Sequence, residues 1–330
     1  KGALDHIQKP FDNQDVKRAV ARGVEKRQLV KSIRRLETEL GNSWGNIVGE
    51  SEQMKKVFSI MQRVADTPTT VLVTGESGTG KELFAQSIHN ASARAQGPFI
   101  AINCAALPQN ILESELFGYV SGAFTGANKE GKPGLFELGH NGTVFLDEIA
   151  ELSLENQGRL LRVLQEKTIM RLGSDRVIPV DVRIIAATNK DLKKMVAEGR
   201  FRDDLYYRLN VLRLLLPPLR ERTEDIEIYA RYYLANYAQR LNKSLELSRS
   251  AVQWLKLYQW PGNIRELSNV IERAINMTSG SYLTEEHFPA EITPLADGVN
   301  SLVRGILETR EAGKAFIITG DAKHVEEVAE

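Results

Sequence analysis

The sequence predicts an α/β fold in which a parallel β-sheet is flanked by helices and followed by a smaller α-helical domain. Two observations support this fold class. Up to about residue 216, unbroken apolar runs of strand length alternate with helical patterns, which is typical of parallel strands buried on both faces. From residue 223 to residue 276 helical periodicity alone remains, so a helical lid is expected after the sheet.

Five apolar runs are the candidate strands. They occupy residues 71–73, 99–101, 144–146, 182–187 and 211–216. Pro217 and Pro218 end the last run, because proline removes a backbone donor and fixes φ. In the helical part, Ser248 is the expected N-cap of one helix, and residues 260–263 (Trp-Pro-Gly-Asn) form the expected turn before another.

Composition excludes several classes of protein. The chain has 330 residues, 42% of them hydrophobic, which is enough for a sizeable core and excludes global disorder. Lys plus Arg and Asp plus Glu both total 43, so no chain-wide basic field attracts nucleic acid. Cys104 is the single cysteine, which rules out an internal disulfide and a cysteine-based zinc cluster.

No apolar run approaches the roughly 20 residues of a membrane span, and no signal peptide opens the chain. The sequence therefore predicts a cytoplasmic protein. Because it starts at Lys1, without methionine and in mid-pattern, we expect a piece of a longer protein.

A narrow apolar stripe precedes the sheet domain. Leu29, Ile33, Leu36 and Leu40 are spaced four, three and four residues apart among charged residues. Two interpretations fit this spacing: a short dimerising coiled coil, and a helix that packs against its own neighbouring domain.

A glycine-rich loop follows the first strand and precedes a helix. It consists of Gly75, Glu76, Ser77, Gly78, Thr79, Gly80 and Lys81. This order suits a phosphate cradle, because glycines let backbone N–H groups point at phosphates and the lysine reaches the outer ones. The general pattern has Ser or Thr next as a magnesium ligand, but Glu82 stands there. A chance glycine turn is the alternative.

A second strand ends in two adjacent acids, Asp147 and Glu148. Ligands of open α/β sheets bind at the carboxyl edge of the strands. We therefore predict that Asp147 holds Mg²⁺ and that Glu148 is the base that activates water for attack on a γ-phosphate. The alternative is an ordinary helix start, where acidic residues are common.

Two further pairs of polar residues follow later in the chain. Thr188 and Asn189 follow the strand at 182–187 and should reach the same sheet edge, although Asn189 also suits a plain turn. Arg202 and Arg208 lie six residues apart on a predicted helix and could act in a neighbouring subunit's site. A solvated helix with Asp203 and Asp204 as ion-pair partners is the interpretation that the sequence alone favours.

Between the loop and the acids lies the segment ELFGYVSGAFTGA, which ends in Gly122, Ala123, Phe124, Thr125, Gly126 and Ala127. These six residues resemble the polymerase-contacting loop of sigma-54-dependent transcription activators, or bacterial enhancer-binding proteins. The resemblance covers about residues 47–289 and includes GESGTGKE, NCAAL, GTVFLDEI, ATNKDL, FRDDLYYRLNV, LPPLRER and WPGNIREL. It implies the AAA+ type of P-loop NTPase, with a C-terminal α-helical lid.

The resemblance also implies residue roles. Glu82 is usual for the family, so the departure noted above does not count against ATP binding. Asn103 matches the switch residue that restrains Glu148 until the γ-phosphate is sensed. Thr188 and Asn189 match the first sensor, Arg265 matches the second, and Arg202 and Arg208 match the two arginines that act in trans.

Outside the ATPase part, residues 2–11 resemble the last strand and loop of a two-component receiver domain, with Lys9 as its phosphoryl-reading lysine and Pro10 after it. Residues 301–330 do not resemble a helix-turn-helix DNA-binding domain. The expected organisation is a receiver remnant at 1–22, a helical linker at 23–41, the nucleotide-binding domain at 42–220, the lid at 221–292 and a segment without assigned role at 293–330.

The family therefore implies an ATP- and Mg²⁺-dependent ring ATPase, a dimer that becomes a hexamer or heptamer, which remodels sigma-54 RNA polymerase. The expected partners are sigma-54, other copies of the chain, and a sensor kinase that acts on the missing receiver domain. DNA would be contacted only through a domain not evident here, and no membrane is involved. One rival is an unfoldase ring that threads substrate with Phe124 in an aromatic pore loop. Another is a DNA-tethered scaffold, which would need a damaged site or a basic reading helix; the sequence has neither.

Overall fold

The computed structural model describes residues 47–124, 130–241, 243–278 and 280–289. Some of the sequence predictions fall outside these residues. They concern the receiver remnant, the apolar stripe at residues 29–40, the segment 293–330, and Thr125, Gly126 and Ala127. The chain divides into two compact units, Lys1–Ile228 with Gly262–Arg265, and Tyr229–Pro261 with Glu266–Glu330.

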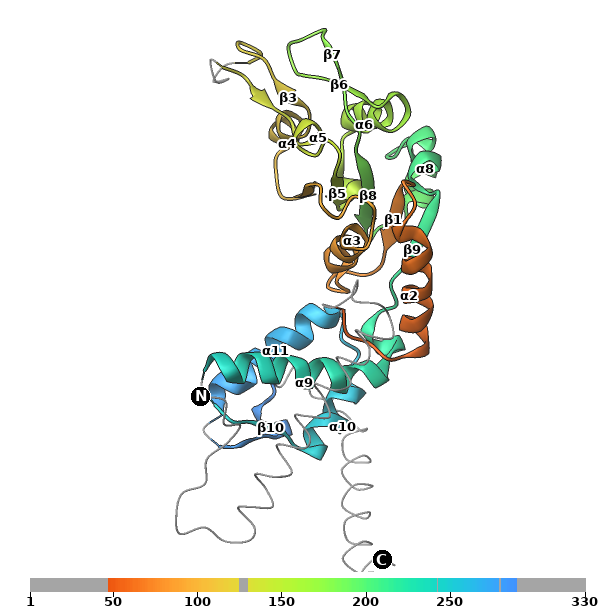
Figure 1. Ribbon diagram of the computed structural model, residues 1–330. Coiled ribbons are helices and arrows are strands. Elements are labelled where there is room, and N and C mark those ends of the chain that lie inside the picture. Colours follow the sequence, from red (N-terminus) through yellow and green to blue (C-terminus); the bar gives the residue numbers. More distant parts are fainter. Residues whose placement is uncertain (1–46, 125–129, 242, 279, 290–330) are drawn as a thin grey trace, which may run out of the picture. The chain divides into compact units, whose positions relative to one another are not determined.

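The first unit is built on the predicted parallel sheet (Figure 1). Its strands are β1 (Val71–Thr74), β2 (Phe99–Asn103), β5 (Thr143–Asp147), β8 (Arg183–Thr188) and β9 (Leu212–Leu215). They are ordered β2-β5-β8-β1-β9, and every neighbouring pair is parallel. The expected α/β architecture is confirmed, and all five strands arise from the five apolar runs.

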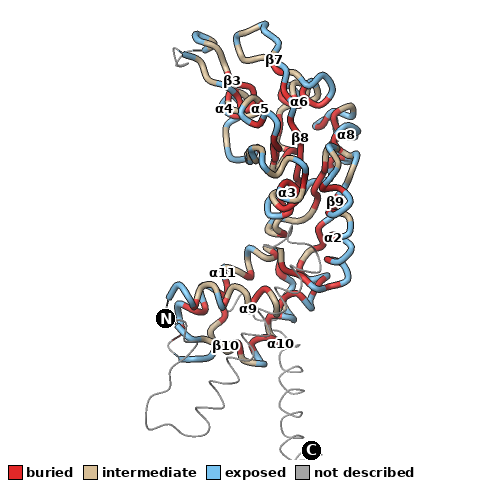
Figure 2. The backbone as a smooth tube through the Cα atoms, in the orientation of Figure 1, coloured by how far each residue is buried: buried red, intermediate tan, exposed pale blue. Residues whose placement is uncertain are grey.

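Both faces of this sheet are buried, as β8 shows most clearly (Figure 2). All six of its residues are buried, and successive side chains point to opposite faces. Ile185 joins a core with α2 (Glu52–Ala65) and α3 (Lys81–Asn90), whereas Ile184 joins a second core with α4 (Gln109–Phe117) and α6 (Leu154–Glu166). Each fully buried isoleucine stabilises the fold by roughly 1.5–3 kcal/mol, which explains why an unbroken apolar run encodes a central strand.

Two short hairpins extend from the helices on the α4 and α6 side. One pairs β3 (Gly118–Tyr119) with β4 (Lys132–Pro133), and the other pairs β6 (Thr168–Met170) with β7 (Val177–Pro179). They lie side by side (Figure 1), because the Val120 amide donates to the Leu172 carbonyl at 3.0 Å and the Leu172 amide to the Gly118 carbonyl at 2.9 Å.

Shorter elements complete this unit. They are α5 (Leu135–Leu138), the 3-10 turn η1 (Ile149–Glu151), α7 (Leu192–Ala197), α8 (Asp203–Leu209) and the 3-10 turn η2 (Leu219–Glu221). Arg171, next to β6, forms an ion pair at 2.7 Å with Glu137 of α5, so the second hairpin is also fixed to α5.

The second unit is mainly helical, as expected. It contains most of α9 (Thr223–Arg240), α10 (Arg249–Leu257) and most of α11 (Asn263–Met277). Ser248 is the predicted N-cap and accepts from the Ala251 amide at 3.0 Å. Trp260 is fully buried, and its indole N–H donates to the Leu255 carbonyl at 2.8 Å.

One detail of this unit differs from the sequence prediction. The sequence pattern predicts only helices and the turns between them in residues 223–276, but β10 (Glu246–Leu247) pairs in parallel with β11 (Tyr282–Leu283). The 3-10 turn η3 (Glu285–His287) follows β11. Two-residue strands contain no apolar run, so the sequence pattern gives no signal for them. Among the residues that the structure describes, no helix combines the length and apolar character needed to cross a membrane.

Candidate functional site

The predicted phosphate loop connects the end of β1 to the start of α3. Gly78 and Gly80 have φ values of +78° and +96°, a backbone region that glycine adopts without steric cost. Gly80 is the N-cap of α3, and having no side chain it leaves the first N–H groups of the helix without a side-chain acceptor. A helix N-terminus of this kind is suited to binding an anion.

Lys81 is the buried cation of this loop. Its side chain is 7% exposed, and its Nζ donates to the carbonyls of Gly75 at 3.1 Å and Glu76 at 3.2 Å. Burial lowers the pKa of Lys81, while the charges of Glu148 and Asp147 act in the opposite direction. The ammonium group is thus held inside the loop by carbonyl oxygens and faced by two acids.

Those acids lie at the carboxyl end of β5. Asp147 is the register partner of Asn103 at the end of β2, and the Asn103 amide donates to Asp147 Oδ2 at 3.4 Å. The Glu148 backbone N–H donates to Asp147 Oδ1 at 3.0 Å. The family resemblance implies a restraint of Glu148 by Asn103, but in this structure the amide of Asn103 contacts Asp147.

Glu148 has an unusual backbone and an unsatisfied carboxylate. Its φ is +50°, in the left-handed region that non-glycine residues rarely occupy and that concentrates at functional sites. Its Oε1 lies 3.9 Å from Lys81 Nζ, and its Oε2 is buried without a hydrogen-bond partner among the described residues. A strained residue with an orphaned carboxylate oxygen is a strong catalytic candidate.

The loop and the acids face one cavity of about 410 Å³. It is lined by Ser77, Gly78, Gly80, Lys81, Glu82, Leu83, Gln86, Asn103, Asp147, Glu148 and Arg265. Most of the predicted cradle and both predicted acids therefore meet at one place. The side chains of Leu83 and Gln86 were not predicted, yet residues 82, 83 and 86 share one face of a helix, a periodicity that the sequence already contained.

Five of the predicted nucleotide-site residues lie outside the cavity lining: Gly75, Glu76, Thr79, Thr188 and Asn189. Thr188 is fully buried; its Oγ1 accepts from the Lys190 amide at 3.0 Å, and its carbonyl accepts from the Gly75 amide at 3.3 Å. It therefore supports the loop from the neighbouring strand. Asn189 is exposed.

Arg265, in the first turn of α11, does line the cavity, and its guanidinium donates to Ser77 Oγ at 3.4 Å. The other two predicted arginines lie elsewhere in the same unit. Arg202 is the N-cap of α8 instead of a residue within the helix, and it pairs with Asp204 at 2.7 Å. Arg208 is in the last turn of α8 and is exposed. The solvated ion pair expected from the sequence thus exists for Arg202.

Of the GAFTGA sequence the structure describes Gly122, Ala123 and Phe124, which follow β3. Gly122 has a φ of +76°, and no heavy atom lies within 4 Å of the position that a Cβ would take there. Phe124 is 46% exposed, and its ring packs edge-on against Tyr119 with the centroids 5.0 Å apart. Exposure of the Phe124 ring at a glycine turn agrees with the sequence prediction.

The donor groups at the cavity fit a magnesium ion that binds together with a polyphosphate. Mg²⁺ is usually held by one or two carboxylates, substrate oxygens and waters, not by an all-protein cage. Within the described ranges no three His, Cys, Asp or Glu side chains form a metal cluster. Asp147 and the orphaned oxygen of Glu148 supply carboxylate oxygens at the cavity.

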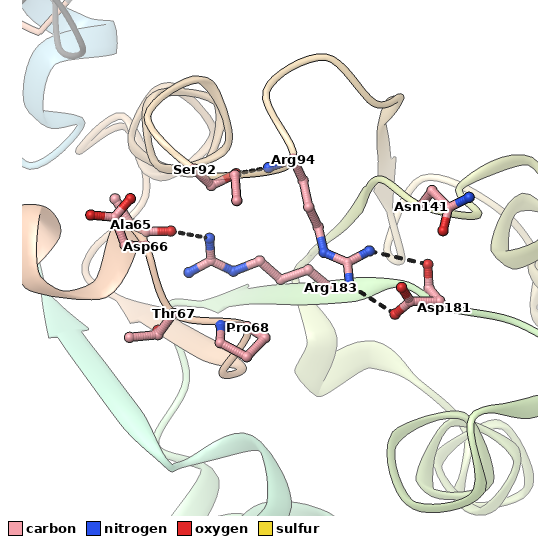
Figure 3. A pocket seen from close by; sticks show the side chains of 10 residues that line it. Ala65, Asp66, Thr67, Pro68, Ser92, Arg94, Asn141, Asp181 and Arg183 are labelled. Carbon is pink, nitrogen blue, oxygen red and sulfur yellow. Dashed lines mark hydrogen bonds and ion pairs between the residues drawn. The ribbon is translucent and has the colours of Figure 1, made fainter.

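A second cavity, of about 390 Å³, lies at the opposite edge of the sheet (Figure 3). Arg183, the first residue of β8, is buried in it and donates to the carbonyls of Val64 and Ala65 at the end of α2. Burial lowers the pKa of Arg183 to about 10. Nearby, Arg94 pairs with Asp181 at 2.8 Å. Arg183 thus connects the end of α2 to β8, and the Arg94–Asp181 ion pair connects the segment after α3 to the segment before β8.

Two family models match this chain. Residues 47–215 match the family model described as the sigma-54 interaction domain, and residues 220–301 match the AAA+ ATPase lid domain. The chain is 48% identical over 294 residues to the regulatory protein AtoC of Escherichia coli, covering 88% of this chain and 64% of AtoC. It is 43% identical over 313 residues to the transcriptional regulatory protein ZraR of Escherichia coli, covering 94% and 70%.

Among solved structures, NtrX from Brucella abortus in complex with ADP has a TM-score of 0.71 and 34% sequence identity, covering 96% of this chain and 69% of NtrX. The chain spans 64% of AtoC and 39% of the signal-transduction and transcriptional-control protein of Clostridium beijerinckii, so it corresponds to part of the length of these relatives.

Proposed function

The chain belongs to the family of sigma-54-dependent transcription regulators, and from that premise we propose that it is an ATP-driven motor that remodels sigma-54 RNA polymerase for open-complex formation. The supporting observation is that the phosphate loop and the acidic end of β5 share one cavity, within residues that match the sigma-54 interaction domain. Because bacterial RNA polymerase works in the cytoplasm, we place the reaction there.

The cavity supplies what ATP hydrolysis needs. The phosphate loop and the N-terminus of α3 bind the phosphates, and Lys81 neutralises their outer charge. The carboxylate of Glu148 takes a proton from the water that attacks the γ-phosphorus, and the bond to the bridging oxygen breaks to release ADP and phosphate. Mg²⁺, when bound, neutralises charge on the phosphates, and Asp147 is the residue that would hold it.

Hydrolysis at a subunit boundary would need a second copy of the chain. Arg202 and Arg208 lie outside the cavity lining of their own subunit, and Arg208 is exposed. An arginine that a neighbouring subunit inserts can stabilise the charge of phosphoryl transfer. We assign this role to both residues in a hexameric or heptameric ring, in which Arg202 leaves its ion pair with Asp204.

A short path joins the cavity to the polymerase-contacting hairpin. β2 ends at Asn103, and α4 runs from Gln109 to Phe117, directly before the hairpin begins at Gly118. Gln109 donates to the Glu151 carbonyl at 2.8 Å and accepts from the Ser153 amide at 3.1 Å. A change in the turn after Glu148 therefore displaces α4, and with it the tip that carries Phe124. The Asn103 switch and the sensor roles of Thr188, Asn189 and Arg265 belong to the same proposal.

An unfoldase ring is the alternative function, and the match of residues 47–215 to the sigma-54 interaction domain favours the polymerase substrate. We further propose two partners, a sensor kinase that acts on a receiver domain and DNA bound through another domain.

The test measures both ring assembly and open-complex formation. Light scattering should report ring-sized particles with an ATP transition-state analogue and smaller ones without it. ATP should then drive open-complex formation on a sigma-54 promoter. ATP hydrolysis that unfolds a model substrate but opens no promoter would favour the unfoldase instead.

A further inference from the structure

Residues 262–265 contact the phosphate loop through backbone hydrogen bonds and belong to the same compact unit as the loop. The Gly78 carbonyl accepts from the amides of Ile264 at 3.1 Å and Arg265 at 3.3 Å. A Cβ at Gly78 would stand 2.1 Å from the Gly262 carbonyl oxygen. The loop and the first turn of α11 therefore meet backbone to backbone, without room for a side chain.

Asn263 is the centre of this contact. Its side chain is fully buried and bonds three groups: Nδ2 donates to the Ser77 carbonyl at 3.0 Å and to Glu76 Oε2 at 3.1 Å, while Oδ1 accepts from the Leu219 amide at 2.8 Å. Its φ of +53° is one that asparagine and aspartate tolerate better than most residues.

The carboxylate of Glu76 is the charged member of the contact. It forms a two-pronged ion pair with Arg220 of η2, with one oxygen 2.8 Å from the guanidinium. The hydrogen bond from Arg220 lowers the pKa of Glu76 to about 2, and Asn263 contributes to the shift. A permanent negative charge thus belongs to a loop whose ligand is a polyphosphate, and Arg220 neutralises it.

We propose that Asn263, with the Glu76–Arg220 ion pair, forms a positioning junction that fixes the shape of the phosphate loop and the place of Arg265 at the cavity. The junction deepens the proposed ATPase function and rests on it. Nucleotide affinity then depends on three side chains, Glu76, Arg220 and Asn263, none of which lines the cavity. The first turn of α11 moves with the loop, so occupancy of the loop is transmitted to the start of that helix.

Asn263→Asp is the sharpest test, because it keeps size, the tolerance for positive φ and the acceptor for the Leu219 amide. It replaces the donor facing Glu76 and Ser77 with an oxygen, so like charges meet and a buried acceptor is left unpaired. We expect the dissociation constant for a fluorescent ADP analogue to rise about tenfold or more. Adding Glu76→Gln provides a donor for the introduced carboxylate and removes the repulsion, so the double variant should recover part of the affinity.

Asn276→Asp, the same change at an exposed position of α11, is the control and should bind like the unmutated protein. Wild-type affinity in Asn263→Asp would overturn the junction, as would a double variant that binds no better than Asn263→Asp. Failure of the unmutated protein to bind the ADP analogue would instead overturn the proposed function.

A surface substitution provides a second test that avoids the buried position. Arg220→Gln leaves the charge of Glu76 uncompensated beside the phosphates, so affinity should fall several-fold and the loss should shrink at high salt. Arg220→Gln combined with Glu76→Gln removes both charges and should restore binding, whereas Arg240→Gln, on the exposed surface of α9, should change nothing. Unchanged affinity in Arg220→Gln would show that the ion pair does not support the loop.

Discussion

Oε1 of Glu148 lies 3.9 Å from Nζ of Lys81, so the proposed base and the proposed phosphate-binding cation face each other across the cavity. Opposite charges at this distance attract, and both side chains are largely shielded from water. The two groups must separate when a γ-phosphate takes its place beside Lys81. Nucleotide binding and positioning of the base are therefore linked through one ion pair.

The first prediction separates these two roles. Glu148→Gln should keep ATP affinity and lose most hydrolysis, with a fall in kcat of roughly 10²–10⁴-fold, because the cradle stays intact while the water loses its base. Lys81→Ala should lose binding itself. Titration with a fluorescent nucleotide and a steady-state phosphate-release assay measure the two effects. Equal ATP affinity in Lys81→Ala and the unmutated protein would refute the assignment.

The second prediction concerns Arg202, the N-cap of α8, and Arg208 in its last turn. Arg202→Ala and Arg208→Ala should each lower kcat by roughly 10³-fold or more under assembling conditions. Inactive Arg208→Ala subunits mixed with inactive Glu148→Gln subunits should regain some turnover, because boundaries with one intact cradle and one intact arginine can form. Wild-type turnover in both arginine variants would place the trans-acting groups elsewhere.

The third prediction concerns the link through Gln109. Gln109→Ala removes both hydrogen bonds between α4 and the turn that follows Glu148, each worth about 1 kcal/mol. ATP hydrolysis should stay near normal, while sigma-54 capture in the presence of a transition-state analogue should weaken. Gln53→Ala, on the exposed side of α2, is the matched control. Normal capture by Gln109→Ala would show that the hairpin is driven by another route.

The fourth prediction concerns pH. His89 is buried, its Nδ1 lies 2.9 Å from Thr143 Oγ1, and burial together with the charge of Arg183 lowers its pKa below the ordinary 6.5. Below pH 6.5 the unfolded chain binds a proton here that the folded chain does not, so the free energy of unfolding should fall as the pH drops.

His89→Asn should make urea unfolding midpoints at pH 7.5 and pH 5.5 more alike, because the variant side chain does not titrate in this range. An undiminished difference in His89→Asn would show that other groups control the acid sensitivity.

The sequence predicts most of this fold because its signals are local. The strand β8 is an unbroken apolar run, Ser248 is a capping residue directly before its helix, and the order of strand, glycine loop, lysine and helix is contiguous. These features need no knowledge of the tertiary contacts.

What the sequence could not predict depends on distant residues. The Asn263 side chain donates a hydrogen bond to Glu76, which is 187 residues away in the sequence. No sequence pattern near either residue indicates this contact. The left-handed backbone of Glu148 and the choice of Asp147 as partner of Asn103 depend on how β2 and β5 end together. The pair β10–β11 consists of two-residue strands, too short for any periodicity.

The central claim is that ATP chemistry at the cavity is converted into contact with sigma-54 through the exposed hairpin tip. Phe124→Ala removes the exposed ring at that tip, and Leu138→Ala removes a similarly exposed apolar side chain of α5. The decisive measurement is co-migration with sigma-54 on a native gel with an ATP transition-state analogue, paired with the steady-state ATPase rate. We predict that Phe124→Ala hydrolyses ATP at a near-normal rate but loses the sigma-54 complex, while Leu138→Ala keeps both. A Phe124→Ala protein that retains the complex would contradict the account, and loss of complex and hydrolysis together would indicate a folding role for the hairpin.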